Sequence, residues 1–283
     1  GTEATGWRRL QKPHPHGKDT LEMIAKLGFD QVKGRVPWLG KRWGRILLLS
    51  CLLLPFAAYL MFFWWLDHLR PYGAVLGQLG LGLCVSIVCY WTMKYVMPKV
   101  RSQSQRTHVL PTWAMPLSCA FIFAPWYALA LHPLLVGGRS LLPWWIAIWL
   151  GALIILVSAL MGRPAIQGGM SLAHLLSIST VFPEERTRVQ SGIYSYIRHP
   201  SYAQLLFMSL GFGLLRNNWL AILTALIFAI PNFVEIRLED EELIDQFGEE
   251  HSRYVKETPA MLPHLSKVRG FLRLLLGKEG EPR

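Results

Sequence analysis

Apolar residues along this chain gather into long runs separated by polar, mostly basic segments. The first run has about the 20 residues that a helix needs to cross the hydrocarbon core of a bilayer. Five further apolar runs follow it, and the last two are shorter. The predicted spans are Ile46–Leu66, Ala74–Met93, Trp113–Val136, Leu141–Met161, Tyr202–Leu215 and Trp219–Val234. This pattern predicts an all-α, polytopic integral membrane protein with about six transmembrane helices and a helix after the last span.

The segments between the runs differ in length and character. Lys94–Thr107 is predicted to be a basic connection, and Arg216–Asn218 a tight turn that makes the last two spans a helical hairpin. Residues 163–190 form the longest connection, in which Ser171–Val181 is expected to be a short surface helix. Pro116 and Pro125 fall inside the third run, so a kinked span is expected there.

Composition and charge support a membrane protein and indicate its orientation. Hydrophobic residues make up 52% of the chain and charged residues only 17%. The formal net charge of +11 does not point to nucleic acid, because the basic residues lie between apolar runs rather than on one polar domain. All the Lys and Arg residues except Arg70, Arg139 and Arg216 fall on one side of the predicted spans. Because cytoplasmic segments attract Lys and Arg, both termini are expected in the cytoplasm, with the chain in a bacterial inner membrane.

The four cysteines do not predict a disulfide framework or a metal centre. Cys51, Cys84, Cys89 and Cys119 all lie inside apolar runs and lack the close spacing of metal-binding pairs. We interpret them as buried apolar side chains, and we expect no metal.

The pattern divides the chain into four parts. Residues 1–45 form a basic cytoplasmic arm, and residues 46–161 a membrane scaffold of four spans. Residues 162–265 contain the last hairpin and most of the candidate chemistry. Residues 266–283 form an amphipathic tail whose apolar side suits an interfacial anchor.

Candidate chemistry concentrates in Gly192–Tyr202, whose sequence is G-I-Y-S-Y-I-R-H-P-S-Y. Arg198 supplies a fixed cation, His199 a titratable imidazole, and Pro200 suits the first position of a helix. After the last span, Glu235, Glu239 and Glu242 share one helical face. Because the hairpin brings its two ends together, a pocket is expected between the motif and this acidic helix. Such a pocket suits a zwitterionic, nucleotide-like cofactor and a lipid co-substrate.

In these residues the chain resembles the superfamily of isoprenylcysteine carboxyl methyltransferases and phospholipid methyltransferases. The superfamily pattern is G-x-Y-x-x-x-R-H-P-x-Y, a hairpin, an acidic segment, F-G-x-x-x-x-x-Y and a proline. The matching residues are Gly192, Tyr194, Arg198, His199, Pro200, Tyr202, Glu239, Asp240, Phe247, Gly248, Tyr254 and Pro263. The resemblance covers roughly residues 171–265. Asp240 departs from it, because the superfamily often has a second glutamate there.

The resemblance implies S-adenosylmethionine as the cofactor and a hydrophobic or lipid-linked acceptor. Catalytic roles are implied for Arg198, Arg237 and Glu239, with the two arginines orienting the substrate or the cofactor carboxylate. Cofactor contacts are implied for Tyr194, Ile197, His199, Pro200, Tyr202, Glu239 and Tyr254. Methyl transfer suits such a sparse site, because positioning alone can supply ~7–11 kcal/mol in favourable cases.

Several alternatives stay open at this stage. The acceptor could be an isoprenylcysteine-type carboxylate, a phospholipid amine or a small thiol. A membrane reductase that uses NADPH has a related C-terminal architecture. The chain could also be a non-catalytic membrane subunit that associates with a larger membrane complex.

Overall fold

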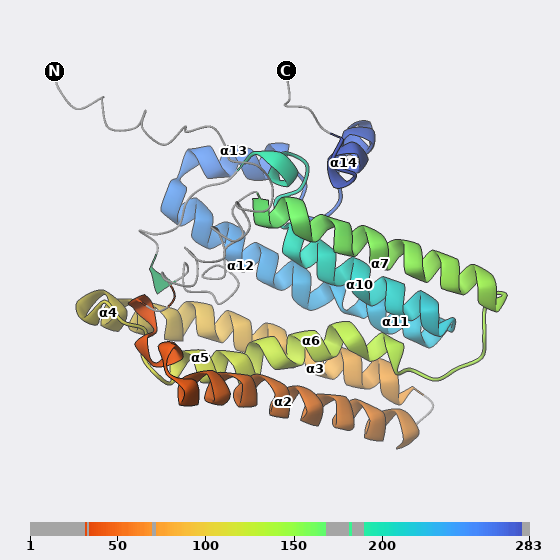
Figure 1. The fold of residues 1–283 in the computed structure, drawn as a ribbon, viewed down its shortest axis with the longest axis horizontal. Helices are drawn as coiled ribbons and strands as arrows, with labels where there is room; N and C mark the ends of the chain where they lie inside the picture. The colour runs from red at the N-terminus through yellow and green to blue at the C-terminus, as the bar shows by residue number, and fades with distance from the viewer. Residues whose placement is uncertain (1–31, 33, 70–71, 168–180, 183–189, 279–283) are drawn as a thin grey trace.

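The computed structural model describes residues 32, 34–69, 72–167, 181–182 and 190–278. Every regular element within these residues is helical, and Figure 1 shows the longer helices running side by side. The α-helices are α2 (Arg42–Leu69), α3 (Gly73–Trp91), α4 (Met97–Thr107), α5 (Ala114–Ser118), α6 (Ala124–Leu131), α7 (Trp144–Gln167), α10 (Pro200–Arg216), α11 (Trp219–Ile227), α12 (Ala229–Phe247), α13 (Glu249–Glu257) and α14 (Val268–Leu275). Shorter 3-10 turns are η2 (Pro37–Gly40), η5 (His132–Leu134), η7 (Gly192–Ser195) and η8 (Leu265–Lys267).

Five helical segments in the described residues are long and apolar enough to cross a membrane. They are Arg42–Leu69, Gly73–Thr107, Ala114–Leu134, Trp144–Ile166 and Trp219–Phe247. The predicted fifth span corresponds to α10, which has 17 residues and is therefore about 26 Å long. The predicted all-α membrane fold is confirmed, with α10 a shorter helix among five longer ones.

One predicted connection is wrong, because a helix continues through a segment that polarity alone assigned to a connection. Residues 94–107 are helical and extend α3 through a π-helical stretch, η3 (Thr92–Val96), into α4. Pro98 lies just after the π-helical stretch, at the beginning of α4. The acidic helix is continuous with the sixth span, since only Phe228 separates α11 from α12.

Two π-helical stretches in the described residues each precede a proline. The first is η3, followed by Pro98, and the second is η4 (Cys119–Phe123), which lies between Pro116 and Pro125. A proline has no N–H, so it removes one hydrogen bond from the regular helical ladder and allows a local change of register. The expected distortion of the third span therefore takes the form of a π-helical segment, a feature that often marks functional sites.

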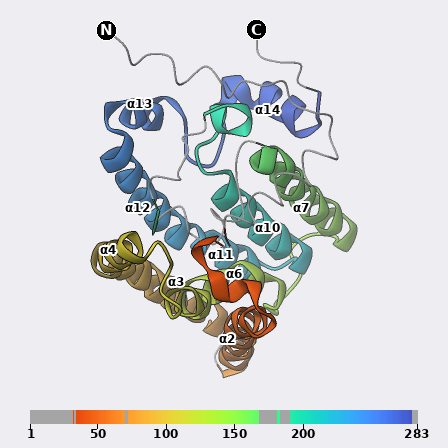
Figure 2. The ribbon, with the colours of Figure 1, turned by 60° about the vertical axis from the view of Figure 1, so that its left-hand side comes forward.

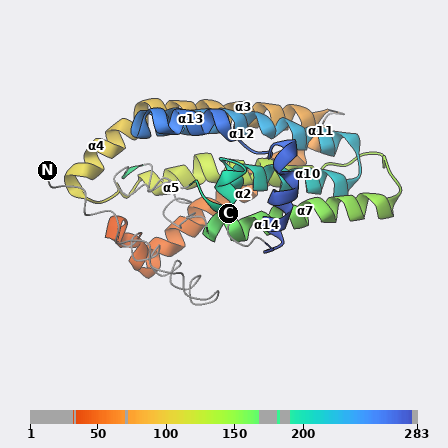
Figure 3. The ribbon, with the colours of Figure 1, turned by 90° about the horizontal axis from the view of Figure 1, so that it is seen from above.

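Small residues let α7 and α10 pack closely, and Figure 2 shows the two helices side by side. A Cβ atom added to Gly151 would lie 2.7 Å from Leu215 and 2.9 Å from the carbonyl oxygen of Gly211. Both glycines are therefore needed for this helix contact. On the other side of the bundle, α11 and α12 lie along α3 (Figure 3), which places the acidic helix opposite η3.

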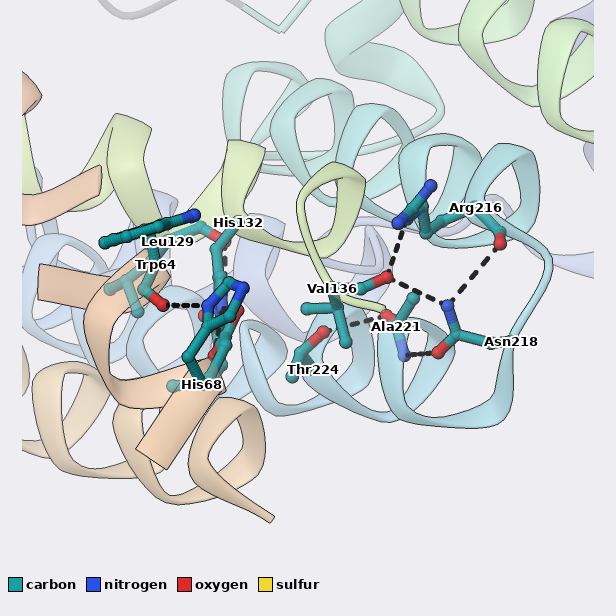
Figure 4. Close-up of polar contacts among 11 residues, drawn as sticks. Trp64, His68, Leu129, His132, Val136, Arg216, Asn218, Ala221 and Thr224 are labelled. Atoms are coloured by element: carbon teal, nitrogen blue, oxygen red, sulfur yellow. Dashed lines mark hydrogen bonds and ion pairs between the residues drawn. The ribbon is translucent and has the colours of Figure 1, made fainter. Parts of the chain in front are cut away.

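The turn end of the bundle, where α10 joins α11, is fastened by side chains of the predicted tight turn. Arg216 Nε and Asn218 Nδ2 donate hydrogen bonds to the carbonyl of Val136, at 2.7 and 3.0 Å (Figure 4). Asn218 Oδ1 also accepts the N–H of Ala221 at 2.8 Å, so it caps the first turn of α11. Asn217 has a φ of 58°, and its side chain makes two hydrogen bonds with Leu142. The Arg-Asn-Asn turn therefore holds both the hairpin and the connection between η5 and α7.

A second polar network at the turn end ties α2 and α3 to the end of α6. His132 is fully buried and stacks on Phe63, with ring centroids 3.8 Å apart. Its Nδ1 lies 2.8 Å from Gln78 Oε1, and its Nε2 lies 3.2 Å from Asp67 Oδ2. Gln78 Nε2 in turn donates to the carbonyl of Leu129. We call Asp67, Gln78 and His132 the turn-end network.

At the opposite end, a hydrophobic cluster supports the candidate motif. Ile193 and Ile197 are completely buried against α7 residues such as Met161. Phe271 and Leu275 of α14 belong to the same cluster, so this face of the amphipathic tail packs on protein. The expected surface helix at Ser171–Val181 and most of the expected arm at 1–45 lie outside the described residues.

Candidate active site

The motif that leads into α10 has its shape fixed by its own turn and by the segment after α13. Gly192 has a φ of 62°, which opens the 3-10 turn η7. His199 precedes the first residue of α10, Pro200, so the helix begins immediately after the imidazole. The backbone N–H groups of Arg198 and His199 donate to the carbonyls of Pro259 and Ala260, both at 2.9 Å. These bonds hold the motif against the segment that follows α13.

Asp240 on α12 joins the two charged residues of the motif. Its Oδ2 accepts from Arg198 Nη2 at 2.8 Å, and its Oδ1 lies 2.9 Å from His199 Nε2. Arg198 Nη1 also donates to the carbonyls of Val255 and Thr258. The side chains of Arg198 and Asp240 are each only 11% exposed, and that of His199 is 5% exposed. The shorter aspartate therefore occupies a central structural position between motif and acidic helix.

His199 is also paired with Glu239, the residue before Asp240. The His199 Nδ1 atom lies 3.4 Å from Glu239 Oε2. Burial by itself would lower the pKa of His199, but hydrogen bonds to Asp240 and Glu239 outweigh burial and raise the pKa to about 9. The imidazole is therefore cationic at neutral pH and is held between two carboxylates.

Three tyrosines predicted to contact a cofactor lie around this charged cluster. The ring of Tyr202 meets that of His199 edge to face, with centroids 5.7 Å apart. Tyr254 donates from its hydroxyl to the carbonyl of Tyr194 at 2.6 Å, so α13 is tied to η7. Burial, together with the charge of Glu239, raises the pKa of Tyr194 to about 12, which keeps this hydroxyl protonated. The tyrosines supply neutral aromatic surface beside the charges.

A cavity of about 190 Å³ lies next to the cluster, between α10, α12 and the two π-helical stretches. Tyr202 and Glu239 line it, which places two predicted site residues on one wall. Its other walls include Cys89, Trp126 and two further acidic side chains, Glu235 and Glu242. The lining therefore combines aromatic surface with carboxylates, a mixture typical of sites for small charged ligands.

A larger cavity of about 460 Å³ adjoins the first. Residues Thr92, Met97, Ser118 and Ile122 line both spaces. The remaining walls of the larger cavity are almost entirely apolar and come from α3 to α5 and from Val181. The two cavities thus place a polar chamber beside an apolar one, with residues of both π-helical stretches between them.

Two interactions at the polar cavity were missing from the sequence-based prediction. Arg101 of α4 forms an ion pair with Glu242 of α12, across 141 positions of sequence. The Cys89 thiol donates a hydrogen bond to Glu235. Nothing in the sequence indicated the first contact, because residues 94–107 were predicted to form a connection. The helical spacing of Glu235, Glu239 and Glu242 was the available signal for the second.

The other predicted site residues have distinct positions. Ile197 is a core side chain, and Pro200 is buried as the first residue of α10. Arg237 lies on an exposed face of α12 and is not part of the lining of the polar cavity. Among the described residues, no cluster of three or more His, Cys, Asp or Glu side chains could hold a metal ion.

Comparisons with known proteins match the same part of the chain. Residues 149–245 match the model of the isoprenylcysteine carboxyl methyltransferase family, a range that includes Arg198, His199, Tyr202, Glu239 and Asp240. The chain is similar to the protein-S-isoprenylcysteine O-methyltransferase of Dictyostelium discoideum, with 27% identity over 85% of this chain and 97% of the relative. No solved structure gives a significant match.

Other relatives match over shorter lengths. The protein-S-isoprenylcysteine O-methyltransferase of Xenopus laevis is 31% identical over 44% of this chain and 43% of its own length. The cobalt-zinc-cadmium resistance protein CzcN of Cupriavidus metallidurans is 40% identical over 31% of this chain and 40% of its own length. The chain thus spans under half the length of these two relatives. The match to the isoprenylcysteine carboxyl methyltransferase family thus lies in residues 149–245, which carry the charged cluster described above.

Proposed function

We propose that this protein transfers a methyl group from S-adenosylmethionine to a hydrophobic or lipid-linked acceptor at the membrane surface. One observation carries the proposal: the cluster of Arg198, His199 and Asp240 lies beside a polar cavity that adjoins an apolar one. This arrangement can hold a charged cofactor and a lipid chain next to each other. The family match and the names of the relatives support the same activity.

The residues present fit S-adenosylmethionine, which carries a positively charged sulfur and supplies an activated methyl group when bound. Carboxylates line the polar cavity, and the rings of Tyr202 and Trp126 meet edge to face with centroids 6.0 Å apart. Carboxylates and aromatic faces both favour a cationic group. We assign cofactor contacts to His199, Tyr202 and Glu239 first, and to Tyr194 and Tyr254 around them. Arg198 is a positioning residue, because it acts through Asp240.

We further propose that the site faces the cytoplasm, with both termini on that side, in a bacterial inner membrane. The distribution of Lys and Arg supports this orientation. The methyl acceptor would then enter sideways from the lipid into the apolar cavity. The second and third of the predicted spans supply most of the acceptor wall, through α3, η3, α5 and η4.

The test is to incubate the purified full chain with methyl-labelled S-adenosylmethionine and a total membrane extract, and to identify the labelled product. Binding of S-adenosylhomocysteine is measured separately by calorimetry, with NADPH as the competing cofactor. We expect saturable binding of S-adenosylhomocysteine and a labelled lipid-soluble product. Binding of NADPH alone would support a reductase, and binding of neither cofactor would support a non-catalytic subunit.

A histidine variant connects this activity to the cluster. His199→Ala is expected to weaken S-adenosylhomocysteine binding by about tenfold or more, because a buried cation next to two carboxylates is lost. His264→Ala is the matched control, since His264 is exposed and lies outside the cluster. Equal affinities of the two variants would remove His199 from the cofactor site.

A further inference from the structure

Helix α14 has apolar side chains on two faces, and the described residues cover only one of them. Phe271 and Leu275 are buried in the hydrophobic cluster that supports the motif. Leu272 and Leu276 lie on another face, where they are 45% and 60% exposed. Leu265, in the turn η8 that leads into the helix, is 94% exposed. These three leucines lie outside the five candidate spans, so contact with lipid along a span does not account for their exposure.

Basic side chains lie beside the exposed leucines. Arg269 and Arg273 are exposed, and each stands three residues before one of the two leucines of the helix, on the same side. Lys267 and Lys278, next to the two ends of the helix, are exposed as well. No Asp or Glu occurs between residues 258 and 278, so this stretch carries positive charge without an acid of its own. We call Arg269, Leu272, Arg273 and Leu276 the outer face of α14.

Helix α14 lies across the end of a candidate span. It contacts α7, and its Phe271 belongs to one cluster with Met161 and Ala165 of that helix. These two residues lie in the last turns of the candidate span Trp144–Ile166. Figures 1 and 3 both show α14 running across the direction of α7. A helix in this position lies along the surface of the membrane, at the level of the lipid head groups.

The buried face of α14 contacts the candidate motif. The rings of Phe271 and Tyr196 pack in a tilted arrangement with centroids 5.9 Å apart. Gly270 permits this close approach, because a Cβ atom at its position would lie 2.8 Å from Tyr196 Oη. Tyr196 follows the turn η7 and stands two residues before Arg198 and three before His199. A displacement of α14 would therefore remove support from the charged cluster.

We propose that the outer face of α14 binds anionic phospholipid head groups, and that this contact holds the motif in the geometry of the site. Its arginines meet the negative head groups, while its leucines enter the boundary of the acyl chains. An anionic surface is the matching partner because the stretch is basic and has no acid that would compensate its charge. The connection to cofactor binding rests on the proposed function, whereas the lipid contact does not.

The test follows hydrogen exchange of the full protein in two kinds of nanodisc, one of phosphatidylcholine alone and one with phosphatidylglycerol in equal parts. Peptides from α14 and η7 should exchange severalfold more slowly with phosphatidylglycerol, because a bound helix opens less often. The turn at residues 216–218 should exchange equally in both. Equal exchange of α14 in the two nanodiscs would overturn the proposal. Protection of α14 by polyglutamate but not by phosphatidylglycerol would also overturn it, in favour of an acidic protein partner.

A pair of double variants places the effect on α14. Arg269→Gln with Arg273→Gln keeps the leucines and should remove most of the response to phosphatidylglycerol, because each basic residue near an anionic surface strengthens binding about fivefold. Arg253→Gln with Lys256→Gln is the matched control, since both residues are exposed on α13, which also carries glutamates. A response that survives in the α14 variant, or that is lost equally in the α13 variant, would contradict the assignment to the outer face.

The affinity for S-adenosylhomocysteine tests the connection to the site. In the wild type this affinity should be severalfold higher with phosphatidylglycerol, and in Arg269→Gln with Arg273→Gln it should be the same in both nanodiscs. If phosphatidylglycerol protects α14 but leaves the affinity unchanged, the connection to the motif is overturned. If α14 is protected and no S-adenosylhomocysteine binds in either nanodisc, the proposed function fails and the lipid contact stands.

Discussion

The two ends of the helix bundle both bury polar side chains, but they do so differently. At the turn end, His132 has a partner at each ring nitrogen, and Asn218 uses both its amide oxygen and its amide nitrogen. At the site end, Asp240 connects Arg198 and His199, yet a buried oxygen of Glu235 and the Nε of Arg198 have no hydrogen-bond partner among the described residues. Only the site end adjoins the polar cavity.

This difference separates structural polarity from functional polarity within one membrane protein. A network whose donors and acceptors are satisfied stabilises helix packing and leaves little for a ligand to bind. Unsatisfied groups beside a cavity carry a cost that a ligand can relieve. We therefore expect changes at the turn end to lower stability alone, and changes at the site end to alter both stability and cofactor binding.

The largest effect is expected for Asp240→Asn. This change removes the shared charge from two buried partners, Arg198 and His199, and breaking a buried ion pair typically costs about 3–5 kcal/mol. We expect a lower free energy of unfolding and a strong loss of S-adenosylhomocysteine affinity, measured by denaturation in mixed micelles and by calorimetry. Asp245→Asn, an exposed change on the same helix, is the control. Unaltered affinity in Asp240→Asn would contradict a functional role for this cluster.

The second effect concerns pH. Because the pKa of His199 is raised from 6.5 to about 9, the folded state holds this proton more tightly than the unfolded chain does. The resulting stabilisation is complete below about pH 6.5 and is lost as pH rises through about 9. The difference in Tm between the wild type and His199→Phe should shrink over this interval. If this Tm difference stays constant from pH 6 to pH 10, the charged state of His199 is disproved.

A smaller effect is expected for His132→Phe in the turn-end network. The substitution keeps an aromatic ring against Phe63 but leaves the buried Gln78 without its histidine partner, which typically costs about 1–3 kcal/mol. Thermal unfolding should show this loss, while S-adenosylhomocysteine affinity stays within about twofold. The same change at exposed His68 should have less effect on Tm. Weakened cofactor binding in His132→Phe would break the proposed separation between the two ends.

The smallest effect is expected for Asn218→Ala. It removes the cap of α11 and one hydrogen bond to Val136, while Arg216 still donates to the same carbonyl. Loss of such a cap typically costs about 1 kcal/mol. Thermal unfolding measures the change, and an unchanged Tm would show that the hairpin does not depend on this cap.

Polarity along the chain predicted the helices well and their ends poorly. The run at 46–66 is the middle of α2, which extends from Arg42 to Leu69. Residues 94–107 carry basic side chains that suggested a connection, but such residues are also good helix formers, and Arg101 is used by Glu242 on a distant helix. A long-range partner of this kind leaves no local sequence signal, so the helix could not be distinguished from a loop.

The sequence by itself determined the membrane class, the hairpin and the charged motif, because hydrophobic length and helical spacing are local properties. It also placed Arg198, His199 and Glu239 among the candidates. Only the tertiary structure decided which charges meet: Asp240 joins the motif, Arg237 faces outward, and Glu235 is left without a described cation. These pairings depend on how α3, α10 and α12 pack, and packing brings together residues that are up to 141 positions apart.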